Sequence, residues 1–288
     1  MIFKRILQYS LSMAAAGALM VSCDKIEEPF TEKITVDTTI QTSHTKRVLL
    51  EDYTGHQCVN CPEAALIAHD LKNLKGDKLV VIAVHAGWFA KATPAGDFTA
   101  DYTTDAGDAW DAFFGISNVG NPNGLVNRKY FTTSEHILSP PAWSTEVLNV
   151  LADTVVTVDL KINNNYNAEN RLLNSEITVE FVKPVDKDLN LIVVLTESGI
   201  VSPQKNNNAE VGVTPIIYDY VHNHMLRDAL TGTWGVEVAK AGTANPATLK
   251  KNFNYTVNQA FNADNCSIVA FVYDVATKEV LQAVEKQL

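Results

Sequence analysis

The chain has 288 residues, 46% of them hydrophobic and 19% charged, which is typical of a folded globular protein rather than a disordered or fibrous one. Its 33 acidic residues outnumber its 23 Lys and Arg residues, so the net charge is −10. Nucleic-acid binding needs clustered basic side chains, and we therefore do not expect it. Four cysteines are too few to staple a chain of this length, so a buried core must stabilise it.

Residues 1–23 have the pattern of an export signal. Lys4 and Arg5 precede a mostly apolar stretch that is too short and too polar to span a bilayer comfortably, and small residues follow it. The end of the stretch, Leu-Met-Val-Ser-Cys, resembles a bacterial lipobox, which implies that Cys23 becomes the lipidated first residue of the mature protein. A plain secretory signal with an incidental cysteine is the alternative.

Residues 24–45 are polar, rich in Thr and poor in periodic apolar positions, which predicts a flexible tether. The acidic run from Asp24 to Glu28 is similar to the surface-export signal of some outer-membrane lipoproteins. We therefore expect a protein anchored to the outer membrane by lipid and facing the periplasm or the cell surface. Exported compartments are oxidising, so cysteine pairing becomes chemically meaningful there.

Residues 46–152 alternate between strand-like and helix-like segments, which predicts an α/β domain. Pro62 suits a first helical turn and Gly76 a helix C-terminus, while the unbroken apolar run at 79–85 indicates a central strand covered on both faces. In chain order the predicted elements are strand 48–53, helix 62–74, strand 79–85, helix 105–114, strand 124–130 and helix 141–151.

Residues 153–288 change to short β-rich runs without intervening helices, and this pattern predicts a β-sandwich as a second domain. Connections rich in Asn or containing Pro separate the runs, for example Asn163–Asn165 and Asn206–Asn208. The predicted strands are 154–162, 175–182, 189–196, 252–259, 267–274 and 279–284.

The most informative motif is Cys58-Val-Asn-Cys61, between a predicted strand and a predicted helix. Its position places both sulfurs in the turn that enters the helix, where the helix dipole stabilises a thiolate. We expect Cys58 to be the more exposed nucleophile and Cys61 the partly buried resolving thiol. A C-x-x-C pair beside a βα unit is the signature of thioredoxin-like redox chemistry.

Two other interpretations of the motif stay open. A structural disulfide could simply pin the turn, or His56, Cys58 and Cys61 could bind copper or zinc, although no fourth ligand is identifiable. Covalent haem attachment needs a His directly after the second cysteine, and Pro62 stands there. We therefore expect no cofactor and no metal.

The segment from Leu49 to Pro62 resembles the strand and active-site turn of the thioredoxin superfamily. That resemblance implies a buried proton acceptor at Asp52, six positions before Cys58, and a proline facing the disulfide, normally after a cis peptide bond, for which Pro122 is the candidate. The chain departs from the family at Gln57, where a Trp is usual, and at Asn121 before the proline. The distance to Pro122 indicates an insertion at residues 88–110.

The second half offers weaker signals. In a strand, His222 and His224 would share a face and could bind a metal or titrate near neutral pH, but a polar outer face is the favoured interpretation. Cys266 lies in an apolar β run and is expected to be an inert core thiol. The G-x-S-x-G, P-loop and H-E-x-x-H motifs are absent from the sequence, which argues against the hydrolase and nucleotide-binding classes.

Taken together, the lipobox, the segment around Cys58 and the Val221–His224 segment before Gly232–Gly235 resemble the twenty-eight-kilodalton outer-membrane-protein family of surface lipoproteins. The resemblance implies a thioredoxin-like domain followed by an immunoglobulin-like β domain, with adhesin or receptor roles for the family.

Two functions follow as hypotheses. In the first, the protein exchanges thiols and disulfides with a protein partner, and the candidate catalytic residues are Cys58, Cys61, Asp52 and Pro122. In the second, it is a surface binding or adhesin lipoprotein that contacts a receptor, and the Cys58–Cys61 disulfide is purely structural.

Overall fold

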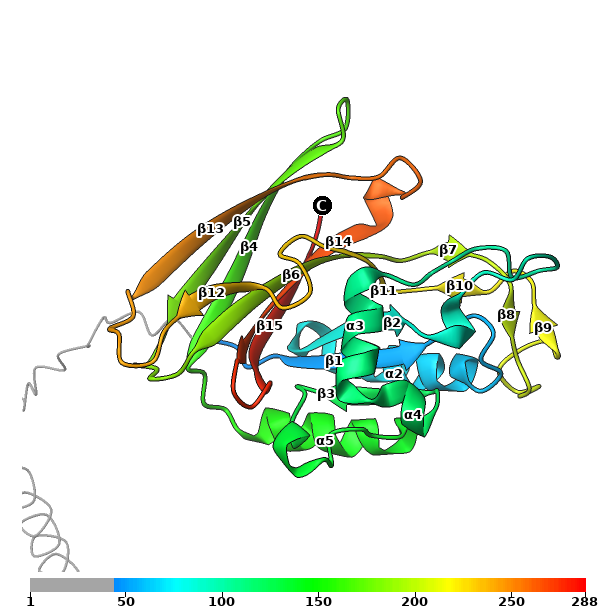
Figure 1. The fold of residues 1–288 in the computed structure, drawn as a ribbon, viewed down its shortest axis with the longest axis horizontal. Helices are drawn as coiled ribbons and strands as arrows, with labels where there is room; N and C mark the ends of the chain where they lie inside the picture. Colours follow the sequence, from blue (N-terminus) through cyan, green and yellow to red (C-terminus); the bar gives the residue numbers. More distant parts are fainter. Residues whose placement is uncertain (1–43) are drawn as a thin grey trace, which may run out of the picture. The chain divides into compact units, whose positions relative to one another are not determined.

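The computed structural model describes residues 44–288, so the predicted signal peptide, Cys23 and nearly all of the predicted tether lie outside the described residues. The chain has a mixed α/β fold with a large mixed sheet and a separate three-stranded antiparallel sheet (Figure 1). Within residues 44–288, none of the helices combines the length and apolar character needed to cross a bilayer.

The large sheet joins strands from both halves of the sequence in the order β15-β14-β6-β11-β2-β1-β3, and β12 also pairs with β6. Their bounds are β1 Val48–Thr54, β2 Leu79–His85, β3 Asn123–Val126, β6 Leu189–Glu197, β11 Met225–Ala229, β12 Val236–Ala239, β14 Cys266–Asp274 and β15 Val280–Gln287. β1 and β2 run parallel, whereas β3 runs antiparallel to β1.

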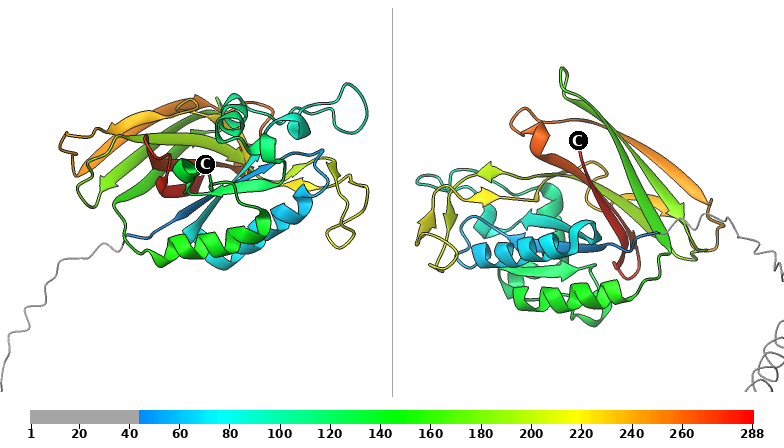
Figure 2. Two further views of the ribbon diagram at one scale, coloured as in Figure 1. Left: turned by 60° about the horizontal axis from the view of Figure 1, so that its bottom comes forward. Right: turned by 180° about the vertical axis from the view of Figure 1, so that it is seen from behind.

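Helices cover both faces of the β1–β2–β3 part of the sheet because β1 is apolar on both faces. Val48 and Leu50 pack in one core with α2 (Cys61–Lys75) and α5 (Pro140–Ala152). Leu49 and Tyr53 alternate with them and face the opposite core, which contains α3 (Asp105–Phe114). The short helix α4 (Ile116–Val119) follows α3. Figure 2 shows α2 and α5 side by side below the sheet.

The three-stranded sheet has the order β13-β5-β4, with bounds β4 Val158–Asn167, β5 Leu172–Phe181 and β13 Thr248–Thr256. It packs through a third apolar core against β6 and β14 of the large sheet. β11 connects this region to the first half, because Met225 pairs with Ala83 of β2 in parallel and with Glu197 of β6 in antiparallel register. Strands from before and after residue 152 therefore share one hydrogen-bonded sheet.

The predicted elements of the first half agree with the structure except at β3, which ends at Val126 rather than at residue 130. Asn127 and Arg128 have positive φ values of 50° and 51°, and this left-handed backbone ends the strand. In the second half, Asn163–Asn165 were predicted as a connection but belong to β4, where they pair with β5. The side chains of these three residues alternate between the two faces of β4. The strand keeps its backbone pairing with β5, so Asn is tolerated there.

Candidate functional site

Cys58 and Cys61 form a disulfide with a Cα–Cα distance of 5.4 Å. The loop that carries Cys58, residues 55–60 (the disulfide loop), connects the carboxyl end of β1 to α2, whose first residue is Cys61. Pro62 occupies the first turn of the helix, as predicted. In this oxidised state neither sulfur is a thiolate, so the alternative metal site with His56 has no sulfur ligand.

Gly55 begins the disulfide loop at a place where only glycine fits. A Cβ at this position would lie 2.5 Å from the carbonyl carbon and oxygen of Phe89, well inside van der Waals contact. The Phe89 carbonyl also accepts a hydrogen bond of 3.0 Å from the Gln57 N–H. The segment at 88–110, predicted as an insertion, therefore supports the loop directly through the short helical turn Trp88–Ala90.

Both cysteines are buried, each with 2% of its surface exposed, so the expectation that Cys58 is the more exposed one is wrong for this state. A segment from the second half, Gln204–Asn208, lies along the disulfide loop and is called the strap below. The Lys205 N–H donates to the His56 carbonyl at 2.8 Å, and the Asn207 N–H donates to the Val59 carbonyl at 3.1 Å. Sequence analysis treated this Asn-rich stretch only as a connection.

Asp52 lies on β1 on the same face as Leu50, beneath α2. Its side chain is 3% exposed, and Oδ1 has no hydrogen-bond partner among the described residues. Burial disfavours the charged form and raises the pKa of Asp52 from 3.8 to about 7. A carboxyl group with this pKa exchanges its proton readily at neutral pH.

Asp52 and Cys61 line the same small cavity, whose volume of about 30 Å³ is enough for one water molecule. His85, Gln204 and His222 complete much of its wall. A larger groove of about 540 Å³ reaches Asp52 from outside. The groove runs between α2 and the segment that follows the strap, and its lining includes Leu66, His69, Val211, Tyr220 and His224.

Three histidines surround Tyr102 next to this cavity, with ring-centroid distances to Tyr102 of 5.1 Å for His56, 5.6 Å for His85 and 5.7 Å for His222. Burial lowers the pKa of all three rings, and that of His222 falls to about 4. The rings are therefore neutral at physiological pH. Sequence analysis missed His85 because it ends an apolar strand and carries no motif.

The two histidines of the second half do not share a strand face, and the favoured interpretation, a polar outer face, is wrong for His222, which is buried. β10 (Val221–His222) ends at His222, whose ring is buried against His85 at 5.4 Å. His224 has a φ of 55°, which ends the strand alternation, and its Nδ1 lies 3.7 Å from Glu285 Oε1. The left-handed backbone thus sends the two rings to different surroundings.

Pro122 directly precedes β3, and the Asn121–Pro122 peptide bond is cis. Asn123 pairs with Tyr53 near the end of β1. Because β3 is antiparallel to β1, Pro122 lies beyond the carboxyl end of β1, which is the end from which the disulfide loop departs. Cys266 lies elsewhere, in the third core: its thiol is free and fully buried, and burial raises its pKa to about 12, as expected for an inert thiol.

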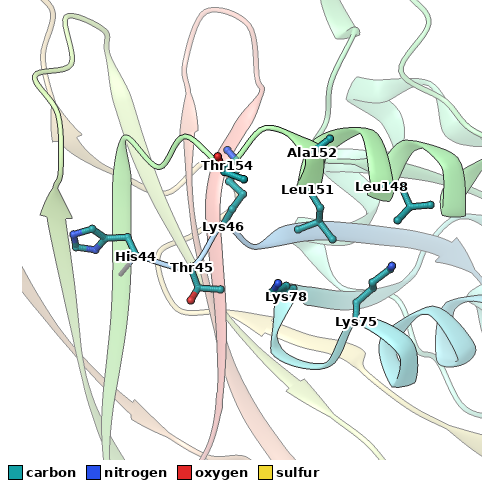
Figure 3. Close-up of a pocket in the computed structure, with 9 residues that line it drawn as sticks. All are labelled: His44, Thr45, Lys46, Lys75, Lys78, Leu148, Leu151, Ala152 and Thr154. Atoms are coloured by element: carbon teal, nitrogen blue, oxygen red, sulfur yellow. The ribbon is translucent and has the colours of Figure 1, made fainter. Parts of the chain in front are cut away.

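A separate basic pocket of about 520 Å³ lies where the described chain begins (Figure 3). Lys46, Lys75 and Lys78 contribute to its wall together with apolar side chains of α5 such as Leu148 and Leu151. Among residues 44–288, Lys75 and Lys78 form no ion pair. Lys46 precedes the amino end of β1, whereas the disulfide loop follows its carboxyl end. This pocket was not predicted.

The fold and the site define a mixed α/β protein with a buried C-x-x-C disulfide. The model of the family described as outer membrane protein Omp28 matches residues 108–288, which is more than half of the chain. The chain therefore belongs to the Omp28 family of outer-membrane proteins. This assignment confirms the family resemblance and the outer-membrane location inferred from the sequence.

Solved structures add a likeness in fold. HBP35 of Porphyromonas gingivalis is similar over 85% of this chain and 76% of its own, with a TM-score of 0.60 at 15% identity. A domain of the outer membrane lipoprotein Omp28 from the same organism is 21% identical over 46% of this chain and 89% of its own, with a TM-score of 0.31. A comparison with curated proteins gives no match.

Proposed function

We propose that this outer-membrane protein is a lipid-anchored thiol–disulfide exchange protein, with Cys23 as the lipidated residue and Cys58 and Cys61 as the exchanging pair. Residues 46–152 would form a thioredoxin-like domain and residues 153–288 an immunoglobulin-like β domain. The partner would be a protein that carries a dithiol or a disulfide. This chemistry takes place between sulfur atoms and requires neither a metal nor a cofactor.

The observation that carries this proposal is the buried Oδ1 of Asp52, which has no hydrogen-bond partner among the described residues, at the cavity that Asp52 and Cys61 line together. A buried carboxyl oxygen without a hydrogen-bond partner reduces stability, and a purely structural disulfide does not require a carboxyl group beside it. A proton acceptor beside the resolving sulfur is what exchange chemistry needs, because the sulfur alternates between thiol and thiolate.

The geometry supports the following sequence of steps with a dithiol partner. A partner thiolate attacks Cys58 Sγ, the Cys58–Cys61 bond breaks, and Cys61 leaves as a thiolate, which receives a proton from Asp52. The second partner thiolate then attacks the partner sulfur of the mixed disulfide and releases Cys58 as a thiolate. The partner loses two electrons and becomes a disulfide, and the protein gains them. The two protons that the partner thiols released are taken up by Cys58 and by Asp52, so both cysteines end as thiols and Asp52 is protonated again. A disulfide partner is reduced by the same steps in reverse.

Pro122 lies at the same end of β1 as the disulfide loop, and in this proposal it shapes the surface on which the partner docks. The α2 N-terminus contributes as well, because its unpaired backbone N–H groups favour the thiolate over the thiol. Cys58, three residues before Cys61, would then react as the nucleophile once it is accessible.

A second candidate function is surface binding with a structural disulfide. The 2% exposure of both cysteines favours it, because a reactive disulfide must be reachable by its partner. The basic pocket with Lys75 and Lys78 offers such a protein a site for an anionic group.

A redox titration separates the two functions. We expect the Cys58–Cys61 couple, equilibrated with dithiothreitol or glutathione buffers and quantified by alkylation and mass spectrometry, to have a reduction potential above roughly −250 mV. A potential below about −300 mV would support the structural disulfide instead.

Two variants complete this experiment. Cys58→Ser should abolish exchange with a protein disulfide, whereas Cys266→Ser, which removes the free buried thiol, should leave exchange unchanged. Retention of every partner interaction and phenotype by Cys58→Ser would count against the redox role.

A further inference from the structure

The strap covers the disulfide loop by pairing with it as an additional strand would. Its two backbone donors, the N–H groups of Lys205 and Asn207, are two residues apart and point to the same edge, where the carbonyls of His56 and Val59 accept. Alternate N–H donors of this kind are typical of an extended segment, although the two acceptors are three residues apart and belong to a turn. The acceptors flank Cys58 in the disulfide loop, so the strap occupies the backbone edge beside the disulfide.

Gln204 fixes the start of the strap to the same loop. Its side chain is 2% exposed, and its amide Nε2 donates to the carbonyl of Cys58 at 2.9 Å and to that of Gly55 at 3.3 Å. Further along, Asn207 Nδ2 donates to Asn60 Oδ1 at 2.7 Å. The strap therefore contacts almost every residue of the loop through polar groups.

The strap belongs to a hairpin that has its own internal hydrogen bonds. β8 (Gln204–Lys205) pairs with β9 (Ile216–Ile217), and the Asn206 side chain donates to three carbonyls within the connecting segment, those of Asn208, Gly212 and Val213. These bonds hold the hairpin together without involving the disulfide loop. Figure 1 shows β8 and β9 at the end of the molecule, beyond β7 (Ile200–Val201) and β10.

We propose that the strap occupies the partner-binding edge of the disulfide loop and that an extended segment of a partner polypeptide replaces it during exchange. The partner segment offers two backbone N–H donors, two residues apart, to the carbonyls of His56 and Val59. While the strap is in place, the disulfide is shielded from small thiols. The role of this edge in partner binding rests on the proposed exchange function. Strap opening and peptide binding at the edge can be measured even if the protein does not exchange disulfides with a partner.

Strap opening is tested by the kinetics of disulfide reduction in the full chain with Cys23→Ser, which has no cysteine to lipidate. Dithiothreitol transfers two electrons to Cys58–Cys61 and closes to its own cyclic disulfide. We expect the reduction rate to level off at high dithiothreitol concentration, because strap opening becomes limiting. In Gln204→Ala the plateau should rise about tenfold, because two hydrogen bonds that must break before the strap opens are missing from the closed state and no longer add to the barrier to opening.

Two control variants separate local opening from other effects. Val213→Ala changes an exposed side chain of the same hairpin and should leave the plateau unchanged. Ile177→Ala opens a cavity in the third core and lowers global stability without touching the strap, so it should also leave the plateau unchanged. A rate that stays proportional to dithiothreitol concentration, or an equal acceleration by Ile177→Ala, would overturn the gating role.

Edge binding is tested with a mixed disulfide. An unstructured peptide that carries one cysteine is attached to Cys58 in the Cys61→Ala variant, and hydrogen exchange is followed by mass spectrometry. We expect residues 204–208 to lose protection while residues 55–60 remain protected, because the peptide replaces the strap. Unchanged protection of the strap in the mixed disulfide would refute the proposal. Neither readout depends on the reduction potential, so this proposal and the exchange function can fail separately.

Discussion

Asp52→Asn is expected to make the protein more stable above pH 7 by up to ~4 kcal/mol, which is the free energy of a pKa shift of roughly three units. The reason is that at these pH values the wild-type protein keeps a charged carboxylate buried, which lowers its free energy of unfolding. In the folded protein the pKa is about 7, whereas the ordinary value is 3.8. An amide has nearly the same shape and carries no charge.

The sign of the pH dependence follows from the direction of this shift. Between about pH 4 and pH 7 the folded protein holds a proton on Asp52 that the unfolded chain has released, so wild-type stability falls as the pH rises through this window. Below about pH 4 both states are protonated, and above about pH 7 the loss is complete. The difference between Asp52→Asn and wild type should therefore be small at pH 4 and largest at pH 8.

Exchange with a protein disulfide should respond in the opposite way. Asn cannot accept or donate the proton of Cys61, so we expect Asp52→Asn to react about a hundredfold more slowly near pH 7, within the range that general acid–base groups contribute. Urea unfolding at pH 4 and pH 8 and stopped-flow exchange rates give the two measurements. Asp70→Asn, on the exposed face of α2, should change neither.

A pH-independent stability difference would contradict the assignment of the buried proton to Asp52. An unchanged exchange rate combined with the expected gain in stability would show that the carboxyl group is buried without serving the reaction, and the proposed function would lose the observation that carries it.

Arg128→Met should lower the free energy of unfolding by about 3–5 kcal/mol, the cost of removing one partner of a buried ion pair. Arg128 and Glu51 are both fully buried and joined by two hydrogen bonds, Nε to Oε2 at 2.7 Å and Nη2 to Oε1 at 2.6 Å. The guanidinium carbon also lies 4.8 Å from the Trp110 ring centroid and 5.0 Å from that of Phe271. Without the cation, Glu51 is an unpaired charge in an apolar core.

Two comparisons test this interpretation by guanidinium unfolding. The double variant Glu51→Leu with Arg128→Met removes both charges and should recover most of the loss, because an apolar pair of similar volume is often as stable as a buried ion pair. Lys161→Met breaks the exposed Lys161–Glu180 pair and should change stability by less than about 1 kcal/mol. A double variant as unstable as Arg128→Met would show that packing, not charge, sets the cost.

Much of the first half of the fold could be predicted from the sequence because its signals are local. The apolar run at Leu79–His85 specifies β2 by itself, and Pro62 and Gly76 mark the ends of α2 within one or two residues. The place of the carboxyl group of Asp52 near the cysteine pair, in contrast, was implied by the resemblance of this segment to the thioredoxin superfamily. Alternation along β1 then sends Asp52 and Glu51 to opposite faces.

The remaining features depend on residues that are distant in sequence. The strap meets the disulfide loop across a separation of 146 residues between Cys58 and Gln204, and no local pattern in an Asn-rich connection specifies that pairing. β11 is five residues long and reads as a strand only because β2 and β6 flank it. The pairing of Glu51 with Arg128 was missed for the same reason.

The sequence by itself determined the family, the outer-membrane location and the element order before residue 152, together with the adjacent positions of a carboxyl group and two cysteines. Only the tertiary structure decided that the sulfurs are covered, that His85 and His222 meet beside them, and that one sheet runs through both halves. Backbone hydrogen bonds and burial can join any two segments that meet in space. The hydrophobic pattern of neither segment identifies its distant partner, so the sequence alone does not predict such contacts.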